Sequence, residues 1–175
     1  MKIYFMAVFC LLLSFSADAQ FYEISGSPFA TEGAPLPSRM QTHGEKLVFV
    51  DPGEHVYGAY GSNGKLIRWG IATAGADQCP DSDNSCRTQT GQFRIYSLGD
   101  AGCASNKYDG APMPYCMYFN GGQALHGSSN VQSDNLSHGC VRLHIDDAKW
   151  LRYQFVEGPR AANLYRGTKV IIASY

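Results

Sequence analysis

The stretch Ser137-His138-Gly139-Cys140-Val141-Arg142, with Leu125-His126-Gly127-Ser128 upstream, gathers a thiol, two imidazoles, an arginine and two glycines. A thiolate is a strong nucleophile, but a thiol with a pKa near ~8.5 needs an imidazole, a cation or backbone donors nearby to lose its proton. His126 is the candidate base. Gly139 permits a tight turn whose backbone N–H groups can point at a developing oxyanion. The pattern therefore predicts an acyl-transfer site with Cys140 as nucleophile.

Two other interpretations of Cys140 stay open on spacing alone. It could be a buried structural thiol or one half of a disulfide, the commonest state of a cysteine in an exported protein. It could also bind zinc together with His126, His138 and His144. Our prediction includes no metal and no cofactor.

Residues 1–19 have the three parts of a secretory signal peptide. Lys2 supplies the positive charge, residues 3–15 the apolar core, and Ala17-Asp18-Ala19 a small-residue cleavage site. The apolar run is shorter than the ~20 residues of a spanning helix, and no later segment comes close. We therefore expect a mature chain that begins near Gln20, is secreted across the inner membrane, has no membrane span, and works in the periplasm or cell envelope.

The composition favours a single β-rich domain. Removal of 19 residues from 175 leaves about 156, enough for one domain with a real core. The 19 glycines and 11 tyrosines, without long charged helical runs, favour strands. A formal net charge of −1 gives no reason to expect a nucleic-acid partner. A monomer is the default expectation.

The mature chain keeps an odd number of cysteines, because Cys10 lies in the signal peptide. The five are Cys79, Cys86, Cys103, Cys116 and Cys140. Four of them fall in a turn-rich stretch, residues 76–116, of the kind that benefits most from crosslinks. Three pairings of these four are possible, and we favour Cys79 with Cys86 and Cys103 with Cys116. Cys140 then stays free, which supports the nucleophile independently of the histidines.

Hydrophobic patterns and turn residues divide the rest of the chain. Residues 20–45, rich in Pro and Gly, form an irregular leader. The predicted strands are 46–50, 54–60, 65–73, 93–98, 116–120, 124–126 and 169–173. One helix is predicted from Asp146 or Asp147, either of which can cap it, to about Val156. No second domain or repeat is indicated.

With these motifs placed, the chain resembles the L,D-transpeptidase catalytic domain, the YkuD-like family. The resemblance rests on the Ser137–Arg142 stretch and the upstream His126-Gly127, and it extends over most of the mature chain, from about Lys46 to Ala173. It implies a catalytic domain over residues 46–175. Residues 87–93 are similar to the family's Thr-Pro-x-Gly-x-Phe element, and residues 166–170 to its closing strand. The resemblance implies a mainly β fold, a β-sandwich or flattened barrel, with one packed C-terminal helix.

The resemblance also implies an activity. Such an enzyme acts on the tetrapeptide stems of peptidoglycan, forms a thioester with Cys140, releases D-alanine and passes the acyl group to an amine of a neighbouring stem. His126 would take the thiol proton and later activate the amine. Water as acceptor would make the protein an L,D-carboxypeptidase, and a lipoprotein lysine is another conceivable acceptor. A non-catalytic, crosslinked envelope or host-contact module that keeps the fold is the remaining alternative.

Further residues take supporting roles by the same resemblance. Backbone N–H groups of His138, Gly139 and Cys140 would line the oxyanion hole, and the Gly127 carbonyl would fix the tautomer of the imidazole. The other predicted supporting residues are Ser137 for the geometry of the motif, Tyr118 at the border of the cleft, and Arg142. Arg142 either grips carboxylates of the stem or pairs with an acid of the fold.

Three features depart from the family pattern. Only ten residues separate His126 from Ser137, so the loop framing one side of the cleft is shorter than in most members. Position 142 is arginine where one branch of the family has asparagine. The crosslinked stretch 76–116 is not part of the general pattern and is predicted to form an insert that narrows substrate choice.

Overall fold

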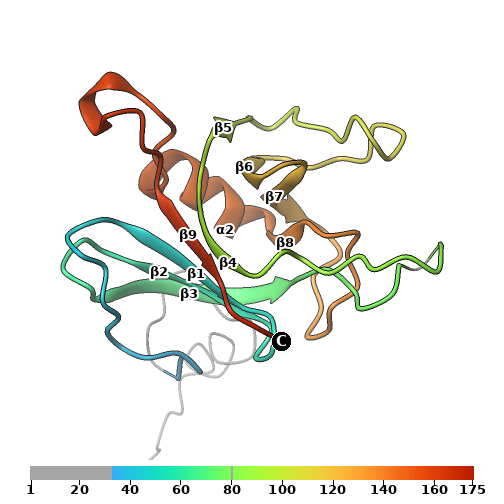
Figure 1. The fold of residues 1–175 in the computed structure, drawn as a ribbon, viewed down its shortest axis with the longest axis horizontal. Coiled ribbons are helices and arrows are strands. Elements are labelled where there is room, and N and C mark those ends of the chain that lie inside the picture. The colour runs from blue at the N-terminus through green and yellow to red at the C-terminus, as the bar shows by residue number, and fades with distance from the viewer. Residues whose placement is uncertain (1–32, 80) are drawn as a thin grey trace, which may run out of the picture.

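A computed structural model describes residues 33–79 and 81–175. The predicted signal peptide, residues 20–32 of the predicted leader and Pro80 lie outside this part of the chain. Within it, nine strands form one curled sheet in the order β4-β9-β1-β2-β3-β8-β7-β6-β5 (Figure 1). The strands are β1 (Leu47–Asp51), β2 (Val56–Tyr60), β3 (Leu66–Thr73), β4 (Gly91–Arg94), β5 (Ser97–Leu98), β6 (Met117–Asn120), β7 (Gln123–Ser128), β8 (Val141–His144) and β9 (Lys169–Ile172).

The first arm of the sheet consists of β4, β9, β1, β2 and β3. It is built on two hairpins that the sequence predicts. β1 pairs with β2 and β2 with β3, both antiparallel. In the first turn the Asp51 carboxylate accepts hydrogen bonds from the N–H groups of Gly53 and Glu54, at 3.0 and 3.2 Å. β9 adds to β1 in parallel, and β4 adds to β9. The last strand of the chain is therefore interior to this arm.

The second arm begins where β3 passes from one set of partners to the other. The end of β3 pairs with β8, and β8 pairs in parallel with β7, which continues the sheet through β6 to β5. The single strand predicted over residues 93–98 is two strands, one in each arm. The Ile95 N–H donates to Thr168 beside β9, whereas the Tyr96 N–H donates to Tyr118 in β6. The chain crosses between the arms at this point and closes the curl.

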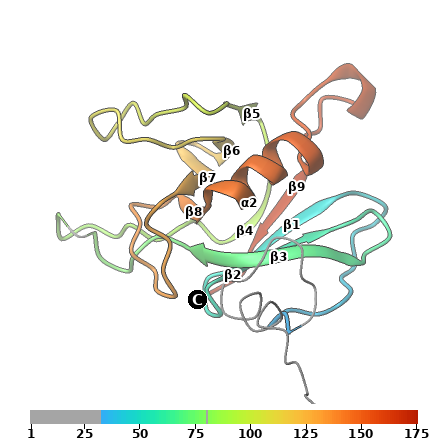
Figure 2. The ribbon, with the colours of Figure 1, turned by 180° about the vertical axis from the view of Figure 1, so that it is seen from behind.

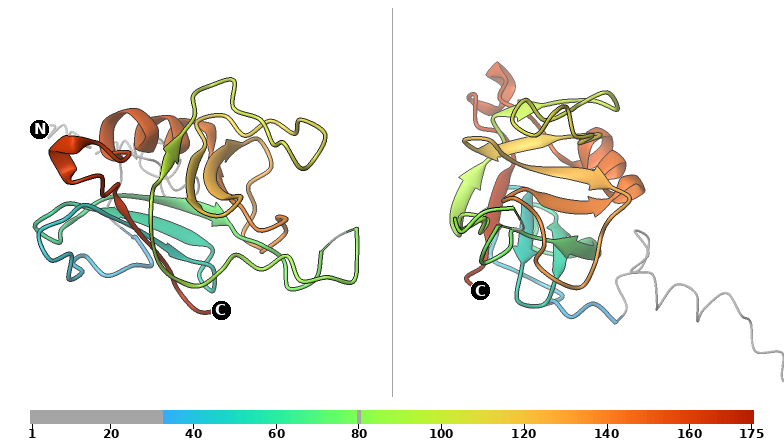
Figure 3. Two further views of the ribbon diagram at one scale, coloured as in Figure 1. Left: turned by 45° about the horizontal axis from the view of Figure 1, so that its top comes forward. Right: turned by 90° about the vertical axis from the view of Figure 1, so that its right-hand side faces the viewer.

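One helical segment fills the space between the two arms (Figures 2 and 3). It consists of α2 (Ile145–Trp150) and a π-helical turn, η1 (Leu151–Phe155); a 3₁₀ turn, η2 (Ala161–Asn163), follows. Ala148, Leu151 and Phe155 are buried, as predicted, in a core shared with both arms. Full burial of each large side chain contributes roughly 1.5–3 kcal/mol. The predicted fold, mainly β with one packed helix near the C-terminus, is confirmed in the form of a curled sheet.

The described part of the predicted leader packs on the domain. Leu36 and Met40 contact a second apolar cluster on the other face of β1, β2 and β3. The Tyr60 hydroxyl donates to the Pro37 carbonyl at 2.9 Å, and Arg39 pairs with Lys65 as an isolated bridge. Both faces of β2 are covered as a result, which explains why all five of its residues are buried. Among the described residues no helix has the length and apolarity to cross a membrane.

Two local predictions are wrong. β8 was not predicted, because its four residues, Val-Arg-Leu-His, are too short a run to separate from the motif before them. The helix begins at Ile145, with His144 as its N-cap residue and no side-chain cap. Neither Asp146 nor Asp147 caps it, since the helix follows directly on β8. Asp147 is buried within the domain instead.

Candidate active site

Two neighbouring strands bring the predicted nucleophile and base together. β7 and β8 are parallel, with His126 opposite Arg142, and Cys140 directly precedes β8. The Cys140 thiol accepts a hydrogen bond from the Ala124 backbone. It also lies 3.7 Å from the Gly122 carbonyl. The order of these strands in the sheet thus places residues from two separate motifs side by side.

The turn before Cys140 is held by Ser137. The Ser137 hydroxyl donates to the Cys140 carbonyl and accepts from the Gly139 N–H at 3.1 Å. Gly139 has φ +111°, a conformation that L side chains rarely adopt. The Gly139 N–H is therefore engaged, which differs from the prediction that it lines the oxyanion hole. The N–H groups of His138 and Cys140 make no hydrogen bond within the described residues.

The His126 imidazole is buried and has one defined tautomer. Its Nδ1 lies 2.9 Å from the Gly127 carbonyl, and because a carbonyl only accepts, Nδ1 carries the proton. Nε2 is then the atom with a free lone pair. Burial lowers the pKa of His126 below its ordinary value, Arg142 lowers it further, and the bond to Gly127 opposes the shift. The imidazole is consequently neutral at neutral pH.

Cys140 and His126 line the same cavity, of about 230 Å³, together with Arg142, Ser137 and Tyr108. Burial raises the pKa of the Cys140 thiol, against smaller effects of the Ala124 hydrogen bond and of Arg142. No hydrogen bond joins the thiol to the imidazole within the described residues. The resting site therefore holds a neutral thiol beside a neutral base, and not a preformed ion pair.

A larger groove, of about 630 Å³, opens on the other side of Cys140. Tyr118 and Tyr96 line it, so Tyr118 borders a cleft that contains the thiol. Both disulfide loops contribute to its walls, the Cys79–Cys86 loop through Ser85 and Cys86 and the Cys103–Cys116 loop through residues 105–108 and Met113, and the β6–β7 turn, residues 121–123, adds a further wall. The stretch predicted as one insert, 76–116, is thus two loops separated by β4 and β5. Cys140 is reached from both the groove and the smaller cavity.

The disulfides join Cys79 to Cys86 and Cys103 to Cys116, the pairing that the sequence favours. Among the cysteines that the structure describes, Cys140 is the free one, and its side chain is half-buried. Its sulfur is therefore available for chemistry. Among residues 33–79 and 81–175, no three His, Cys, Asp or Glu side chains are grouped so that they could hold a metal ion.

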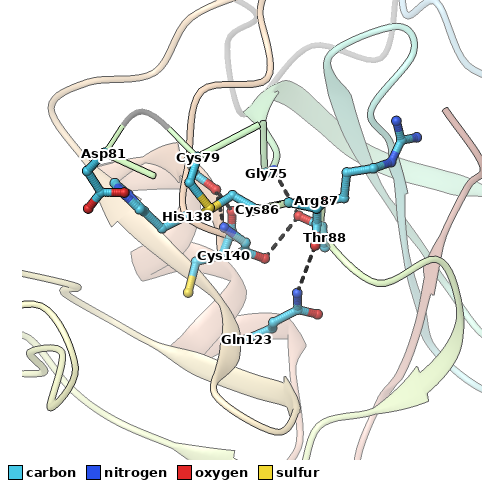
Figure 4. The surroundings of a disulfide bond; sticks show 12 residues. Gly75, Cys79, Asp81, Cys86, Arg87, Thr88, Gln123, His138 and Cys140 are labelled. Carbon is cyan, nitrogen blue, oxygen red and sulfur yellow. Dashed lines mark hydrogen bonds and ion pairs between the residues drawn. A yellow bond between two sulfur atoms is a disulfide. The ribbon is translucent and has the colours of Figure 1, made fainter. Parts of the chain in front are cut away.

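The side chain of His138 joins the two disulfide loops. Its Nε2 lies 3.2 Å from an Asp81 carboxylate oxygen, an ion-pair distance whose angles fall short of a hydrogen bond. Its ring packs on Tyr108, with centroids 4.8 Å apart. Figure 4 shows the imidazole directed to Asp81, away from the Cys140 sulfur. His138 thus contacts a residue of each disulfide loop.

Arg142 has no carboxylate partner within the described residues. It lines the smaller cavity beside Cys140 and His126. Of the two predicted roles, an ion pair with an acid of the fold is therefore not observed. Its charge lowers the pKa of both catalytic candidates, because it disfavours imidazolium and favours thiolate.

Sequence reasoning missed the segment that lies behind the Ser137–Cys140 turn. Gly75 pairs with Ser137 as an isolated bridge. Thr88 contacts Gly75 (Figure 4). It also contacts Gly139. Gln123 donates to the Arg87 carbonyl at 3.2 Å and holds the same segment from the other side. Thr88 belongs to the residue 87–93 element, but nothing in its spacing indicates a contact with a residue 51 positions later.

Replacing Gly75 with alanine is expected to destabilise the protein and the turn together. The added Cβ would lie 1.9 Å from the Cys86 carbonyl oxygen and 2.6 Å from the Thr88 nitrogen, so backbone must move. We expect a loss of about 3 kcal/mol or more in the free energy of unfolding, measured by denaturant titration. Gly102→Ala is the matched control, because its Cβ would meet nothing nearer than 3.8 Å. Equal stability of the two variants would contradict the close approach at Gly75.

The candidate site therefore combines a half-buried free thiol, directly before β8, with a buried, tautomer-fixed histidine inside the parallel neighbour β7, and both line one cavity of the curled sheet. Comparison with known protein families identifies the family of this chain. The chain belongs to the L,D-transpeptidase catalytic domain (YkuD) family, whose model matches residues 45–172. Curated proteins give no match to this sequence.

Solved structures agree with the family. The L,D-transpeptidase from Xylanimonas cellulosilytica is 26% identical, with a TM-score of 0.64, over 79% of this chain and 65% of that one. The L,D-transpeptidase from Stackebrandtia nassauensis is 22% identical, with a TM-score of 0.61, over 81% and 62%. One from Mycobacterium tuberculosis is 16% identical, with a TM-score of 0.56, over 74% and 58%. The chain therefore matches less than two thirds of the length of each.

Proposed function

We propose that this protein is a peptidoglycan-modifying cysteine acyltransferase, an L,D-transpeptidase that acts on tetrapeptide stems. The observation that carries the proposal is the free Cys140 in one cavity with His126, whose Nε2 lone pair is available. The predicted signal peptide and the two disulfides support export to the periplasm or cell envelope, where such crosslinks persist.

In the first step His126 Nε2 accepts the thiol proton and the sulfur attacks the carbonyl carbon that precedes D-alanine. A C–S bond forms, and the carbonyl electrons move to oxygen, where the Cys140 N–H is free to donate. Collapse of this intermediate breaks the C–N bond, and imidazolium returns the proton to the departing D-alanine. The product is a thioester on Cys140.

In the second step an amine of a neighbouring stem attacks the thioester. His126 takes a proton from the amine, the C–N bond forms, and the C–S bond breaks to release the thiol. Arg142, charged and without a carboxylate partner in the described chain, suits the binding of a stem carboxylate in the smaller cavity. If water hydrolysed the same thioester, the protein would be an L,D-carboxypeptidase. If a lipoprotein lysine were the acyl acceptor, the product would be a protein conjugate.

Intact-mass spectrometry after incubation with imipenem tests the nucleophile. Two proteins of this fold have been solved as an imipenem complex (22% identical, TM-score 0.51) and as a faropenem-derived adduct (16% identical, TM-score 0.55). We expect one added imipenem mass, since opening of the β-lactam ring by the Cys140 sulfur loses no atoms. Cys140→Ala should show no adduct. An unreactive wild-type thiol would instead support a non-catalytic envelope module.

Incubation with tetrapeptide muropeptides then identifies the acceptor. Crosslinked dimers would show transfer to an amine, and free tripeptides alone would show transfer to water. If neither product formed, in a preparation whose Cys140 is demonstrably reduced, the enzymatic proposal would be refuted.

A further inference from the structure

Thr88 is a buried polar residue, 1% exposed, directly behind the candidate nucleophile. Its hydroxyl accepts a hydrogen bond from the Gly75 N–H at 2.9 Å and donates one to the Gly139 carbonyl at 3.0 Å. Its own N–H donates to the Tyr175 hydroxyl at 2.8 Å, and that hydroxyl donates to the Gly75 carbonyl at 2.9 Å. Thr88 is thus fixed by three partners, and it connects Gly75, two residues past the end of β3, to the turn before Cys140.

The bond to the Gly139 carbonyl has a consequence for the next residue. The Gly139 C=O and the Cys140 N–H belong to one planar, trans peptide group, so they point in opposite directions. Holding the oxygen toward Thr88 therefore directs the Cys140 N–H away from Thr88. Because Gly139 has no Cβ and lies at φ +111°, its own sterics constrain this peptide plane weakly. A partner outside the turn is needed to hold the plane.

We propose, on the basis of the proposed function, that Thr88 is a positioning residue for acylation. Through the Gly139 carbonyl, its hydroxyl aims the Cys140 N–H at the oxygen that becomes negative when the sulfur adds to the acyl carbon. Thr88 touches neither substrate nor sulfur. Its contribution is confined to steps that create an oxyanion, because a fixed N–H donor stabilises the developing negative charge more than a mobile donor does.

Two reactions of the same thiol separate this role from a purely structural one. Ring opening of imipenem by Cys140 passes through an oxyanion. Alkylation by iodoacetamide forms a C–S bond at a saturated carbon and expels iodide, without an oxyanion. Thr88→Val keeps the shape of the side chain but removes its hydroxyl. We expect acylation to slow by roughly 10- to 100-fold. The rate of alkylation across its pH profile should stay within about twofold, and Thr88→Ser should restore most of the acylation rate.

Tyr175→Phe is the matched control. It removes the hydrogen bonds to the Thr88 N–H and the Gly75 carbonyl but leaves the Thr88 hydroxyl on Gly139. We expect a lower melting temperature with acylation unchanged. The inference is overturned if Thr88→Val is acylated at the wild-type rate, or if alkylation falls as much as acylation. If the wild-type protein is not acylated at all, the proposed function fails first, and this inference fails with it.

Discussion

Replacing His126 with glutamine is expected to slow acylation of Cys140 by imipenem by about 10²- to 10⁴-fold near neutral pH. The resting thiol is neutral, because burial raises its pKa, so a base must take its proton as the C–S bond forms. Nε2 of His126 is the candidate base, because His126 lines the same cavity as Cys140 and its Nε2 lone pair is available. Glutamine keeps a polar side chain of similar reach but accepts no proton. The measurement is the rate of adduct formation, followed by intact-mass spectrometry on samples quenched at a series of times.

The pH dependence gives this prediction a sign. Burial places the pKa of His126 below its ordinary value, so the neutral imidazole predominates at neutral pH. Wild-type acylation should therefore rise along an acid limb below the usual histidine pKa and be level at neutral pH. In His126→Gln the acid limb of the pH profile disappears. The acylation rate then follows the fraction of Cys140 that is ionised to thiolate, and this fraction is low at neutral pH because the pKa of the thiol is raised. The ratio of the two rates should consequently shrink as the pH increases.

His144→Gln is the control for this substitution. His144 ends β8, only four residues after Cys140, but its side chain is exposed. The His144→Gln variant should be acylated at Cys140 at the wild-type rate across the pH range. A ratio of wild-type to His126→Gln rates that does not change with pH, or equal slowing in His144→Gln, would refute His126 as the base.

The cysteine count and the two motifs predict that Cys140 is free and that it lies near His126, as the structure has them. The predicted mature chain, without Cys10, has five cysteines, so one thiol is left over, and the short spacings within residues 76–116 favour local pairs, so Cys140 can be singled out without a structure. The parallel pairing of β7 and β8 is what brings His126 and Cys140 together. That pairing was not predicted, because β8 itself has only four residues.

The residues that support the site could not be predicted, and the reason is physical. Thr88, Asp81 and Tyr108 contact the turn from loops far away in sequence, through one hydrogen bond, one carboxylate–imidazole contact and one ring contact. Such contacts leave no periodic pattern. Asp147 shows the opposite failure: an acidic residue at a helix start usually caps, and here the chain buries it because β8 runs straight into α2.

Asparagine in place of Asp147 is expected to make the protein more stable at pH 7–8. Asp147 is 1% exposed and lies beside Tyr57, in space that exists because Gly70 has no Cβ. Neither carboxyl oxygen makes a hydrogen bond of good geometry within the described residues, although Tyr57 and Arg68 interact with the group. Burial raises the pKa of Asp147 from 3.8 to about 7, against the effects of Tyr57 and Arg68. The folded protein therefore favours the protonated acid.

This raised pKa fixes the direction of the pH dependence. Below pH 3.8 the carboxyl is protonated in both the folded and the unfolded chain, so the ionisation of Asp147 does not change the free energy of unfolding. Between 3.8 and about 7 the unfolded chain loses this proton while the folded chain keeps it. The unfolded state then binds fewer protons, so the free energy of unfolding falls as the pH rises, by about 1.4 kcal/mol per pH unit. Over the whole window the loss is a few kcal/mol.

Asparagine resembles the neutral acid in size and does not titrate, so Asp147→Asn should lack this loss. Denaturant titrations at pH 4, 6 and 8 should give curves that converge at pH 4 and separate as the pH rises, with the variant more stable. Asp146→Asn alters the exposed neighbour and should change stability by no more than about 0.5 kcal/mol at each pH. If Asp147→Asn were instead less stable at pH 8 than the wild type, the carboxylate would have to be ionised and stabilised where it lies. Arg68, whose guanidinium lies over the Trp150 ring at 3.9 Å, would then be the partner that holds it.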